Sequence, residues 1–204
     1  MKEKKETTKE RIFREAVNLF AAKGYHGTSM RELAAAAGIK ESSVYNHFKG
    51  KEAILDAILD YQMSGFSGAG DALDELKGPL HSISDPVQFW LAGASLFLTR
   101  LPPLNREISR ILINEMYLID KCRSFYLHIL RPVQKNLTAT ILSVMRDKKM
   151  IKDCDIEKTA EQYVYFLEGM GIEHNLMMME GVSQDEINKR TLEQVSLFIE
   201  RLKK

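Results

Sequence analysis

Residues 28–51 read TSMRELAAAAGIKESSVYNHFKGK, which is the pattern of two short helices joined by a tight turn. Ser29 and Glu32 have the spacing of a capping box, so a helix is expected to begin there. Gly38 follows the last apolar position of this helix, where a glycine can adopt the left-handed conformation that ends a helix. The stretch therefore predicts one helix that ends at Gly38 and a second over residues 40–48.

The second of these helices is unusually polar. Only Val44 and Phe48, one helical turn apart, are available to a core. Its other side chains carry mostly hydroxyl, amide and imidazole groups: Ser42, Ser43, Tyr45, Asn46 and His47. Such groups suit base edges and phosphate oxygens in a major groove, and Lys51, at the start of a third helix, could hold one more phosphate. A merely solvated helix face has the same composition, so these residues alone leave both interpretations open.

A wider pattern surrounds these two helices. It comprises Gly24-Tyr25, Thr28, Arg31 to Ala34, Ala37-Gly38-Ile39, Val44 to Phe48 and Lys51-Glu52. This pattern resembles the N-terminal signature of the TetR family of transcriptional regulators, and with the helix before it covers about the first 60 residues. The resemblance implies a helix-turn-helix whose second helix enters the major groove, followed by helices that bind a ligand and form a dimer.

The resemblance also assigns roles to individual residues. Six would hold the DNA backbone: Thr28, Arg31, Lys40, Tyr45, His47 and Lys51. Three would read base edges: Ser42, Ser43 and Asn46. Two positions depart from the family pattern, because Lys40 stands where a capping serine or threonine is common and Ser42 where glycine is common. A lysine side chain cannot accept backbone N–H bonds, so the second helix is expected to begin less firmly or one residue later.

Charge is unevenly spread along the chain. Residues 1–52 contain 11 Lys/Arg and 7 Asp/Glu, a net of +4, whereas residues 53–204 contain 18 and 21, a net of −3. A basic head on an acidic body is typical of a DNA-binding domain attached to a domain that does not bind DNA. The two cysteines, Cys122 and Cys154, are too few for a disulfide framework. No apolar run reaches the length of a membrane span and the first residues are charged, so we expect a cytoplasmic protein.

The hydrophobic periodicity predicts an all-α chain of about nine helices. We expect a three-helix DNA-binding domain over residues 1–52 and a larger helical bundle over residues 53–204. Capping residues mark helix starts at Thr7, Asp155 and Ser183. Later helices are expected over residues 86–101, 105–120, 123–149, 156–180 and from 184 onward. Pro132 should kink its helix unless it falls in a first turn. Residues 71–85 should form a partly ordered connection.

The second domain is rich in aromatic residues and methionine. The resemblance makes nine of them pocket candidates: Trp90, Phe97, Met116, Tyr117, Phe125, Tyr126, Tyr163, Phe166 and Met170. His174, on an apolar helix, is a tenth candidate that could hydrogen-bond a ligand or be a satisfied core histidine. These residue types suit an adaptable apolar pocket, but on composition alone an ordinary core is favoured. Glu115, within an apolar run, could face a cation in a pocket, lie at the surface or pair with Arg110 or Lys121.

The last two helices are the expected dimer contact. Gly169 and Gly171 would let another helix approach closely. Four apolar residues form a stripe at helical spacing: Leu192, Val195, Phe198 and Leu202. Without the resemblance, the same stripe would support packing within one chain equally well.

These expectations combine into one functional hypothesis. The protein would be a ligand-responsive repressor that binds a palindromic double-stranded DNA operator as a homodimer and is released by a small, largely apolar effector. The alternative is a constitutive DNA-binding or partner-docking protein without an effector. No enzyme, cofactor or metal site is expected, because the five histidines are scattered and no catalytic or metal-ligand spacing occurs.

Overall fold

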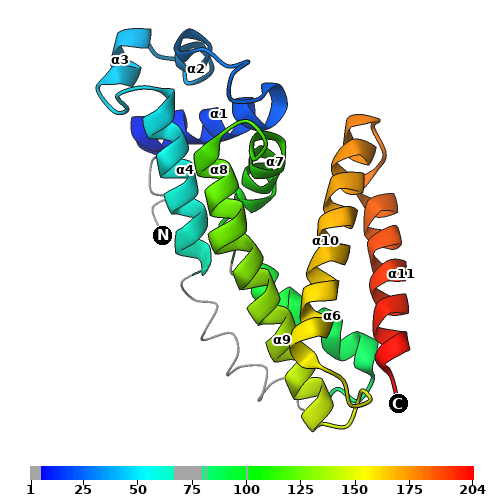
Figure 1. Cartoon of the computed structure of the whole chain (residues 1–204). Coiled ribbons are helices and arrows are strands. Elements are labelled where there is room, and N and C mark those ends of the chain that lie inside the picture. Colours follow the sequence, from blue (N-terminus) through cyan, green and yellow to red (C-terminus); the bar gives the residue numbers. More distant parts are fainter. Residues whose placement is uncertain (1–5, 67–79, 81, 100) are drawn as a thin grey trace, which may run out of the picture. The chain divides into compact units, whose positions relative to one another are not determined.

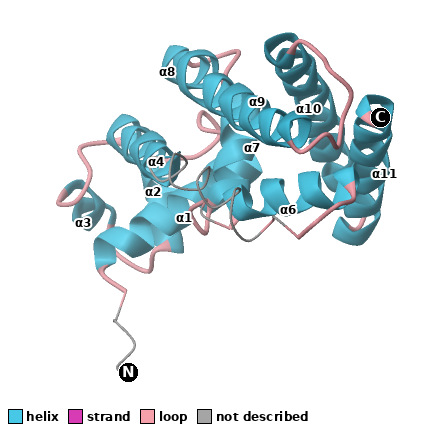
Figure 2. Cartoon of the chain, turned by 90° about the horizontal axis from the view of Figure 1, so that it is seen from below, coloured by secondary structure: helices cyan, strands magenta, loops and turns pink. Residues whose placement is uncertain are grey.

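The computed structural model describes residues 6–66, 80, 82–99 and 101–204, and these form helices and connecting loops, with an isolated β-bridge between Ile151 and Lys203 (Figure 2). The helices in Figure 1 are α1 (Thr8–Lys23), α2 (Met30–Ala36), α3 (Glu41–Tyr45), α4 (Lys51–Phe66), α6 (Pro86–Leu98), α7 (Asn105–Glu115), α8 (Asp120–Phe125), α9 (Arg131–Asp147), α10 (Ile156–Met179) and α11 (Gln184–Leu202). A π-helical turn, Tyr126–Leu130, connects α8 to α9. If α8, the π-helical turn and α9 are counted as one segment, the described residues form nine helical segments. The all-α prediction is confirmed. None of the described helices is both long and apolar enough to cross a membrane.

Local capping explains where several helices begin. Thr7 caps α1 in a capping box with Glu10, Asp155 caps α10, and Ser183 caps α11. Each side chain accepts a backbone N–H that the first helical turn would otherwise leave without a partner. These three predicted starts are confirmed.

Three helices end earlier than the periodicity suggested. α3 ends at Tyr45, α6 at Leu98 and α7 at Glu115. After α7, the N–H groups of Leu118 and Ile119 both donate to the Glu115 carbonyl, at 3.0 and 2.8 Å, so the chain turns before α8 begins. Apolar spacing continues through such a turn, which is why the sequence did not reveal it.

Pro132 lies in the consecutive helical elements formed by α8, the π-helical turn and α9. This proline lies in the first turn of α9, directly after the π-helical turn. Proline has no N–H to donate to the carbonyl four residues back, so a wider turn before it accommodates the ring. Pro132 therefore occupies a first turn, the position at which no kink was expected.

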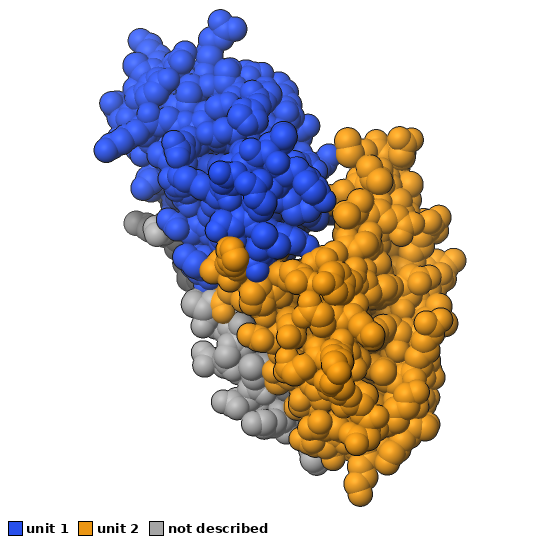
Figure 3. Space-filling model, viewed as in Figure 1, with its two compact units in different colours: residues 1–65, 101–127 blue, residues 66–100, 128–204 orange. Residues whose placement is uncertain are grey.

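The chain forms two compact units, which Figure 3 shows in different colours. Unit 1 comprises residues 1–65 and 101–127, and unit 2 comprises residues 66–100 and 128–204. Unit 1 thus combines the N-terminal helices with α7 and α8. The expected boundary after residue 52 is a functional division and stays a prediction. The expected connection over residues 71–85 lies largely outside the described residues.

Within unit 1, α1 is a packing element. It contacts α2 and α7, and its apolar face buries Ile12, Val17 and Phe20. Phe13 meets Tyr61 of α4 edge to face, with 5.1 Å between the ring centroids. These contacts place the short helices α2 and α3 on a firm base.

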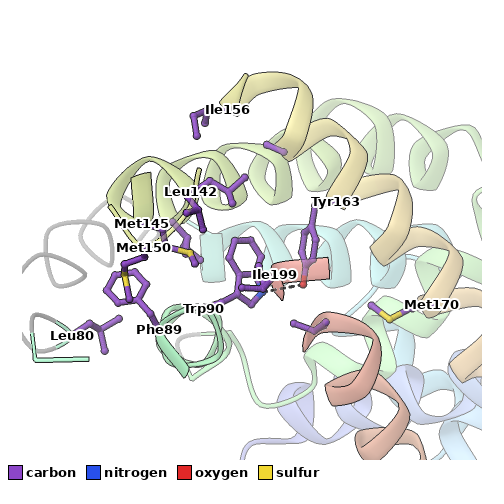
Figure 4. Packing of buried hydrophobic residues seen from close by; sticks show 14 residues of the cluster. Leu80, Phe89, Trp90, Leu142, Met145, Met150, Ile156, Tyr163, Met170 and Ile199 are labelled. Carbon is purple, nitrogen blue, oxygen red and sulfur yellow. Dashed lines mark hydrogen bonds between the residues drawn. The ribbon is translucent and has the colours of Figure 1, made fainter. Parts of the chain in front are cut away.

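Unit 2 is built from α6, α9, α10 and α11 around an apolar cluster (Figure 4). In this cluster the rings of Trp90 and Tyr163 meet edge to face at 4.7 Å between centroids. The Trp90 Nε1–H donates to the Tyr163 hydroxyl oxygen at 3.2 Å. Burial raises the pKa of Tyr163 to about 12, so its hydroxyl stays protonated at neutral pH.

Candidate nucleic-acid interface

The turn into α2 fixes the first helix of the predicted helix-turn-helix. Ser29 Oγ accepts the Glu32 N–H at 3.2 Å, and Glu32 Oε2 accepts the Ser29 N–H at 2.8 Å. Lys23 Nζ lies 2.8 Å from Glu32 Oε1. The Lys23 ammonium and the Ser29 donors lower the pKa of Glu32 to about 2, so this carboxylate stays charged at neutral pH. The predicted capping box is confirmed.

The turn between α2 and α3 depends on Gly38. Its φ of 65° lies in the left-handed region that glycine adopts without steric cost. The N–H of Gly38 donates to the Ala35 carbonyl at 3.1 Å, and the N–H of Ile39 donates to the Ala34 carbonyl at 3.0 Å. These bonds satisfy carbonyls at the end of α2, and the predicted glycine stop is confirmed.

α3 presents a polar surface. Val44 is fully buried and Phe48, just beyond the helix, is 5% exposed. Two of the three predicted base readers, Ser42 and Asn46, are exposed, and the third, Ser43, is half-buried. Tyr45 and His47, predicted to hold phosphates, are also exposed. Lys40 precedes the helix without a side-chain capping bond, as its chemistry predicted. The two apolar anchors therefore fix the direction in which the polar side chains point.

Thr28 does not belong to this surface. Its side chain is 1% exposed, and its Oγ1 donates to the Gly24 carbonyl at 3.0 Å. The hydroxyl therefore holds the turn between α1 and α2 and cannot reach a phosphate, so Thr28 is removed from the predicted contacts. Arg31 and Lys40 are exposed and remain candidates.

Lys51 begins α4 and already has a partner within the chain. Its Nζ donates to the Tyr25 carbonyl at 2.7 Å and lies 4.5 Å from the centroid of the Tyr25 ring. An ammonium group has three N–H donors, so this bond leaves others for a phosphate. Lys51 thus stays a candidate contact with a defined orientation.

Two residues of segment 101–127 contact the same region. Glu115 is 4% exposed, and its Oε1 accepts the Tyr25 N–H at 2.7 Å. Lys121 Nζ lies 2.7 Å from both Glu52 Oε1 and Asp56 Oδ1 of α4, and these carboxylates raise the pKa of Lys121. Sequence reasoning noticed Glu115 as an acid in an apolar run, but it could not find a backbone partner 90 residues away.

A comparison of the sequence with known families agrees with this geometry. Residues 12–58 match the model of the bacterial regulatory proteins of the TetR family. Residues 12–58 therefore form a TetR-type N-terminal domain, and its α2–α3 helix-turn-helix is a DNA-binding module of transcriptional regulators.

Relatives match this chain over different lengths. The HTH-type transcriptional regulator YerO of Bacillus subtilis is 43% identical over 53 residues, which cover 26% of this chain and only 18% of YerO. The HTH-type transcriptional repressor KstR2 of Rhodococcus jostii is 29% identical over 147 residues, covering 70% of this chain and 67% of KstR2. A solved TetR-family regulator of Cytophaga hutchinsonii superposes with a TM-score of 0.66 over 98% of both chains, at 19% identity, and so shares the fold.

The ten pocket candidates divide between the two units. Met116, Tyr117, Phe125 and Tyr126 belong to unit 1, and Trp90, Phe97, Tyr163, Phe166, Met170 and His174 belong to unit 2. Trp90, Tyr163 and Met170 are buried in the apolar cluster, and Phe166 packs against it. Tyr117 is 73% exposed, and His174 Nε2 lies 3.3 Å from Thr191 Oγ1. The Trp90 N–H is satisfied by the Tyr163 hydroxyl oxygen, which is the arrangement of a core pair.

Half of the predicted dimer residues pack inside the protomer. Val195 is 4% exposed, and Phe198 and Leu202 pack against the unit 2 cluster. Gly169 and Leu192 are exposed, and Gly171 is half-buried. The stripe that the sequence suggested is thus largely a core face, because periodicity identifies an apolar face without identifying what covers it.

Proposed function

We propose that the protein is a ligand-responsive repressor that binds a palindromic operator as a homodimer and is released by a small, largely apolar effector. The DNA-binding part of this proposal is supported by the outward polar face of α3. Base edges would be read by Ser42, Ser43 and Asn46, and phosphates would be held by Arg31, Lys40, Tyr45, His47 and Lys51. Burial of Val44 and Phe48 supports this assignment, since it fixes the orientation of the face.

An apolar row on α10 supports a second copy of the chain as the partner. Tyr165, Gly169, Ile172, Leu176 and Met179 follow one another at intervals of four, three, four and three residues, which is the seam of a helix that pairs with another helix. The four large side chains are 45–68% exposed. A Cβ added at Gly169 would meet nothing within 4 Å, so a partner helix has room to approach.

Helix α11 adds to the same proposed interface. It contacts α10, and its Leu192 and Leu197 are 47% and 56% exposed at a shallow surface hollow. Identical rows on two copies can pair across a two-fold axis. The resulting four-helix contact is the one that the family resemblance implies.

Leu176→Asp tests this interface. A charge in the α10 seam should convert dimers to monomers in sedimentation velocity and weaken operator binding, because one protomer holds only one reading helix. Leu98→Asp is the matched control, since Leu98 is a 61% exposed leucine of unit 2 on α6, outside the seam. An unchanged dimer of Leu176→Asp would refute the proposed interface.

Selection of bound sequences from a random DNA pool tests the DNA-binding proposal. We expect two inverted half-sites whose centres are about one DNA turn, ~34–36 Å, apart. Asn46→Ala should relax the preference at one base position, whereas Lys51→Ala should weaken binding to all sequences evenly. A single asymmetric site, or equal losses for both variants on every sequence, would contradict the assigned roles.

The effector is proposed from the apolar, aromatic character of unit 2. The alternative, a constitutive DNA-binding protein, is favoured by one observation, the buried hydrogen bond from Trp90 to Tyr163 within the apolar cluster. A thermal-shift screen of small apolar compounds distinguishes the two, because an effector must both stabilise the protein and release DNA. To shift operator-competent dimers from 99:1 to 1:99, it must favour the released state by ~10⁴.

A further inference from the structure

The turn between α1 and α2 is held by bonds from two other parts of unit 1. Glu115 Oε1, at the end of α7, accepts the Tyr25 N–H at 2.7 Å. Lys51 Nζ, at the start of α4, donates to the Tyr25 carbonyl at 2.7 Å. Both backbone polar groups of Tyr25 are therefore hydrogen-bonded, the N–H to the buried Glu115 side chain and the carbonyl to the Lys51 ammonium.

The turn is shaped around the Glu115 carboxylate. Gly24 has a φ of 78°, and a Cβ added there would lie 3.0 Å from Glu115 Oε1. Glu115 is 4% exposed, and its Oε2 has no hydrogen-bond partner among the described residues. Burying a carboxylate with incomplete hydrogen bonding is costly, so core packing alone does not explain an acid at this position.

Lys51 depends on the same turn for its orientation. The Tyr25 carbonyl accepts one of its three donors, and the Tyr25 ring lies beneath the ammonium at 4.5 Å. A lysine side chain is long and otherwise free to sample many rotamers, so these contacts restrict where its remaining donors point. A displaced Tyr25 would release that restriction.

We propose that Glu115 is a positioning residue for DNA binding, which acts through Tyr25 to hold the Lys51 ammonium where it meets a phosphate. The proposal rests on the phosphate contact of Lys51 in the proposed function. If so, a residue of α7, which lies outside the helix-turn-helix, affects how many DNA phosphates the protein neutralises. Lys121, which reaches α4 through exposed ion pairs, is expected to matter less, because such pairs contribute little.

A double-mutant cycle on the full chain tests this role. The affinity for the selected operator is measured against salt concentration for wild type, Glu115→Met, Lys51→Ala and the double variant. Lys51→Ala and Glu115→Met should each reduce the slope of log affinity against log salt by about 0.9 per bound protomer. Each should weaken binding about tenfold per protomer, the value of about one charge-assisted hydrogen bond. In the Lys51→Ala background, Glu115→Met should have no further effect.

Two more variants separate positioning from a purely structural role. Glu115→Gln keeps an oxygen that can accept the Tyr25 N–H, so it should restore most of the salt slope. Glu107→Met removes the same charge from the first turn of α7 and should leave the slope unchanged. Thermal unfolding of every variant shows how much of each loss comes from the fold.

The possible failures are distinguishable. A normal salt slope for Lys51→Ala would show that Lys51 does not contact a phosphate, and it would refute that part of the proposed function. A reduced slope for Lys51→Ala with a normal slope for Glu115→Met would overturn only the positioning role. Additive losses in the double variant would also overturn it, since they would mean that Glu115 acts independently of Lys51.

Discussion

Both compact units bury apolar side chains, but their long-range polar bonds lie in different surroundings. In unit 1, Glu115 and Lys51 bond to the backbone of Tyr25 in the turn between α1 and α2, so polar bonds join segments distant in the chain. In unit 2, four helices share one apolar cluster, in which the bond between Trp90 and Tyr163 lies among aromatic and aliphatic side chains. Directional bonds thus fix the turn at Tyr25, whereas the cluster of unit 2 is held mainly by apolar packing.

This difference matters because the two kinds of contact control different properties. Apolar burial is non-directional and scales with area, so a cluster shared by four helices contributes mainly to stability. A hydrogen bond contributes less net free energy but fixes where a group points. We therefore expect substitutions in unit 2 to act mainly on stability, and substitutions around Tyr25 to act more strongly on DNA affinity than on stability.

The largest effect is expected for Trp90→Ala in unit 2. It removes a large buried side chain, 2% exposed, and leaves the Tyr163 hydroxyl without its donor. Truncation of such a residue should lower the free energy of unfolding by about 3–5 kcal/mol. Urea unfolding followed by far-UV circular dichroism measures the loss.

Tyr163→Phe is the matched control for that prediction. It keeps the ring and removes only the acceptor of the Trp90 N–H, so the loss should be about 1–3 kcal/mol, the cost of one unsatisfied buried donor. If Trp90→Ala cost no more than Tyr163→Phe, aromatic packing would not be the main source of stability in unit 2.

A smaller effect is expected for Gly24→Ala in unit 1. A residue with a side chain at a φ of 78° is strained by about 1–2 kcal/mol, and the new Cβ would also approach Glu115 Oε1. The free energy of unfolding should fall by about 1–3 kcal/mol, and operator affinity should fall further than the loss of folded protein explains. Gly50→Ala, a change in the same unit with nothing within 4 Å of the added Cβ, is the control. Equal effects of the two substitutions would show that the turn at Gly24 is not specially constrained.

The difference between the units also explains what the sequence could predict. Helix starts at Thr7, Ser29, Asp155 and Ser183 were predicted correctly, because a cap and its partner N–H lie three residues apart. The contact of Glu115 with Tyr25 spans 90 residues, and that of Trp90 with Tyr163 spans 73. Such contacts depend on how helices pack, which no local pattern encodes.

Thr28 and the apolar rows of α10 show the same limit of sequence-based prediction. Thr28 was predicted to touch DNA because a hydroxyl suits phosphate as well as backbone, and only its 1% exposure decides between them. On α10 both faces carry apolar residues, so the spacing could not tell the row at Ile172 and Leu176 from the buried row at Tyr163 and Met170. The outward face of α3 was predictable because only Val44 and Phe48 were available to a core.

The smallest effect on stability is expected for Lys40→Ser, which separates stability from DNA affinity within unit 1. Lys40 precedes α3 with φ −73° and ψ 147°, the extended conformation of an N-cap, yet its side chain makes no capping bond. A serine there can accept an N–H of the first turn and should raise the free energy of unfolding by about 0.5–1 kcal/mol. The same change removes a proposed phosphate contact, so the salt slope of operator binding should fall by about 0.9 per protomer. Lys40→Ala removes the ammonium without adding a cap, and it should reproduce the change in slope without the gain in stability. A Lys40→Ser variant that gains stability and keeps the full salt slope would show that Lys40 does not touch DNA. A variant whose salt slope falls without a gain in stability would show that α3 is already held firmly by Val44 and Phe48.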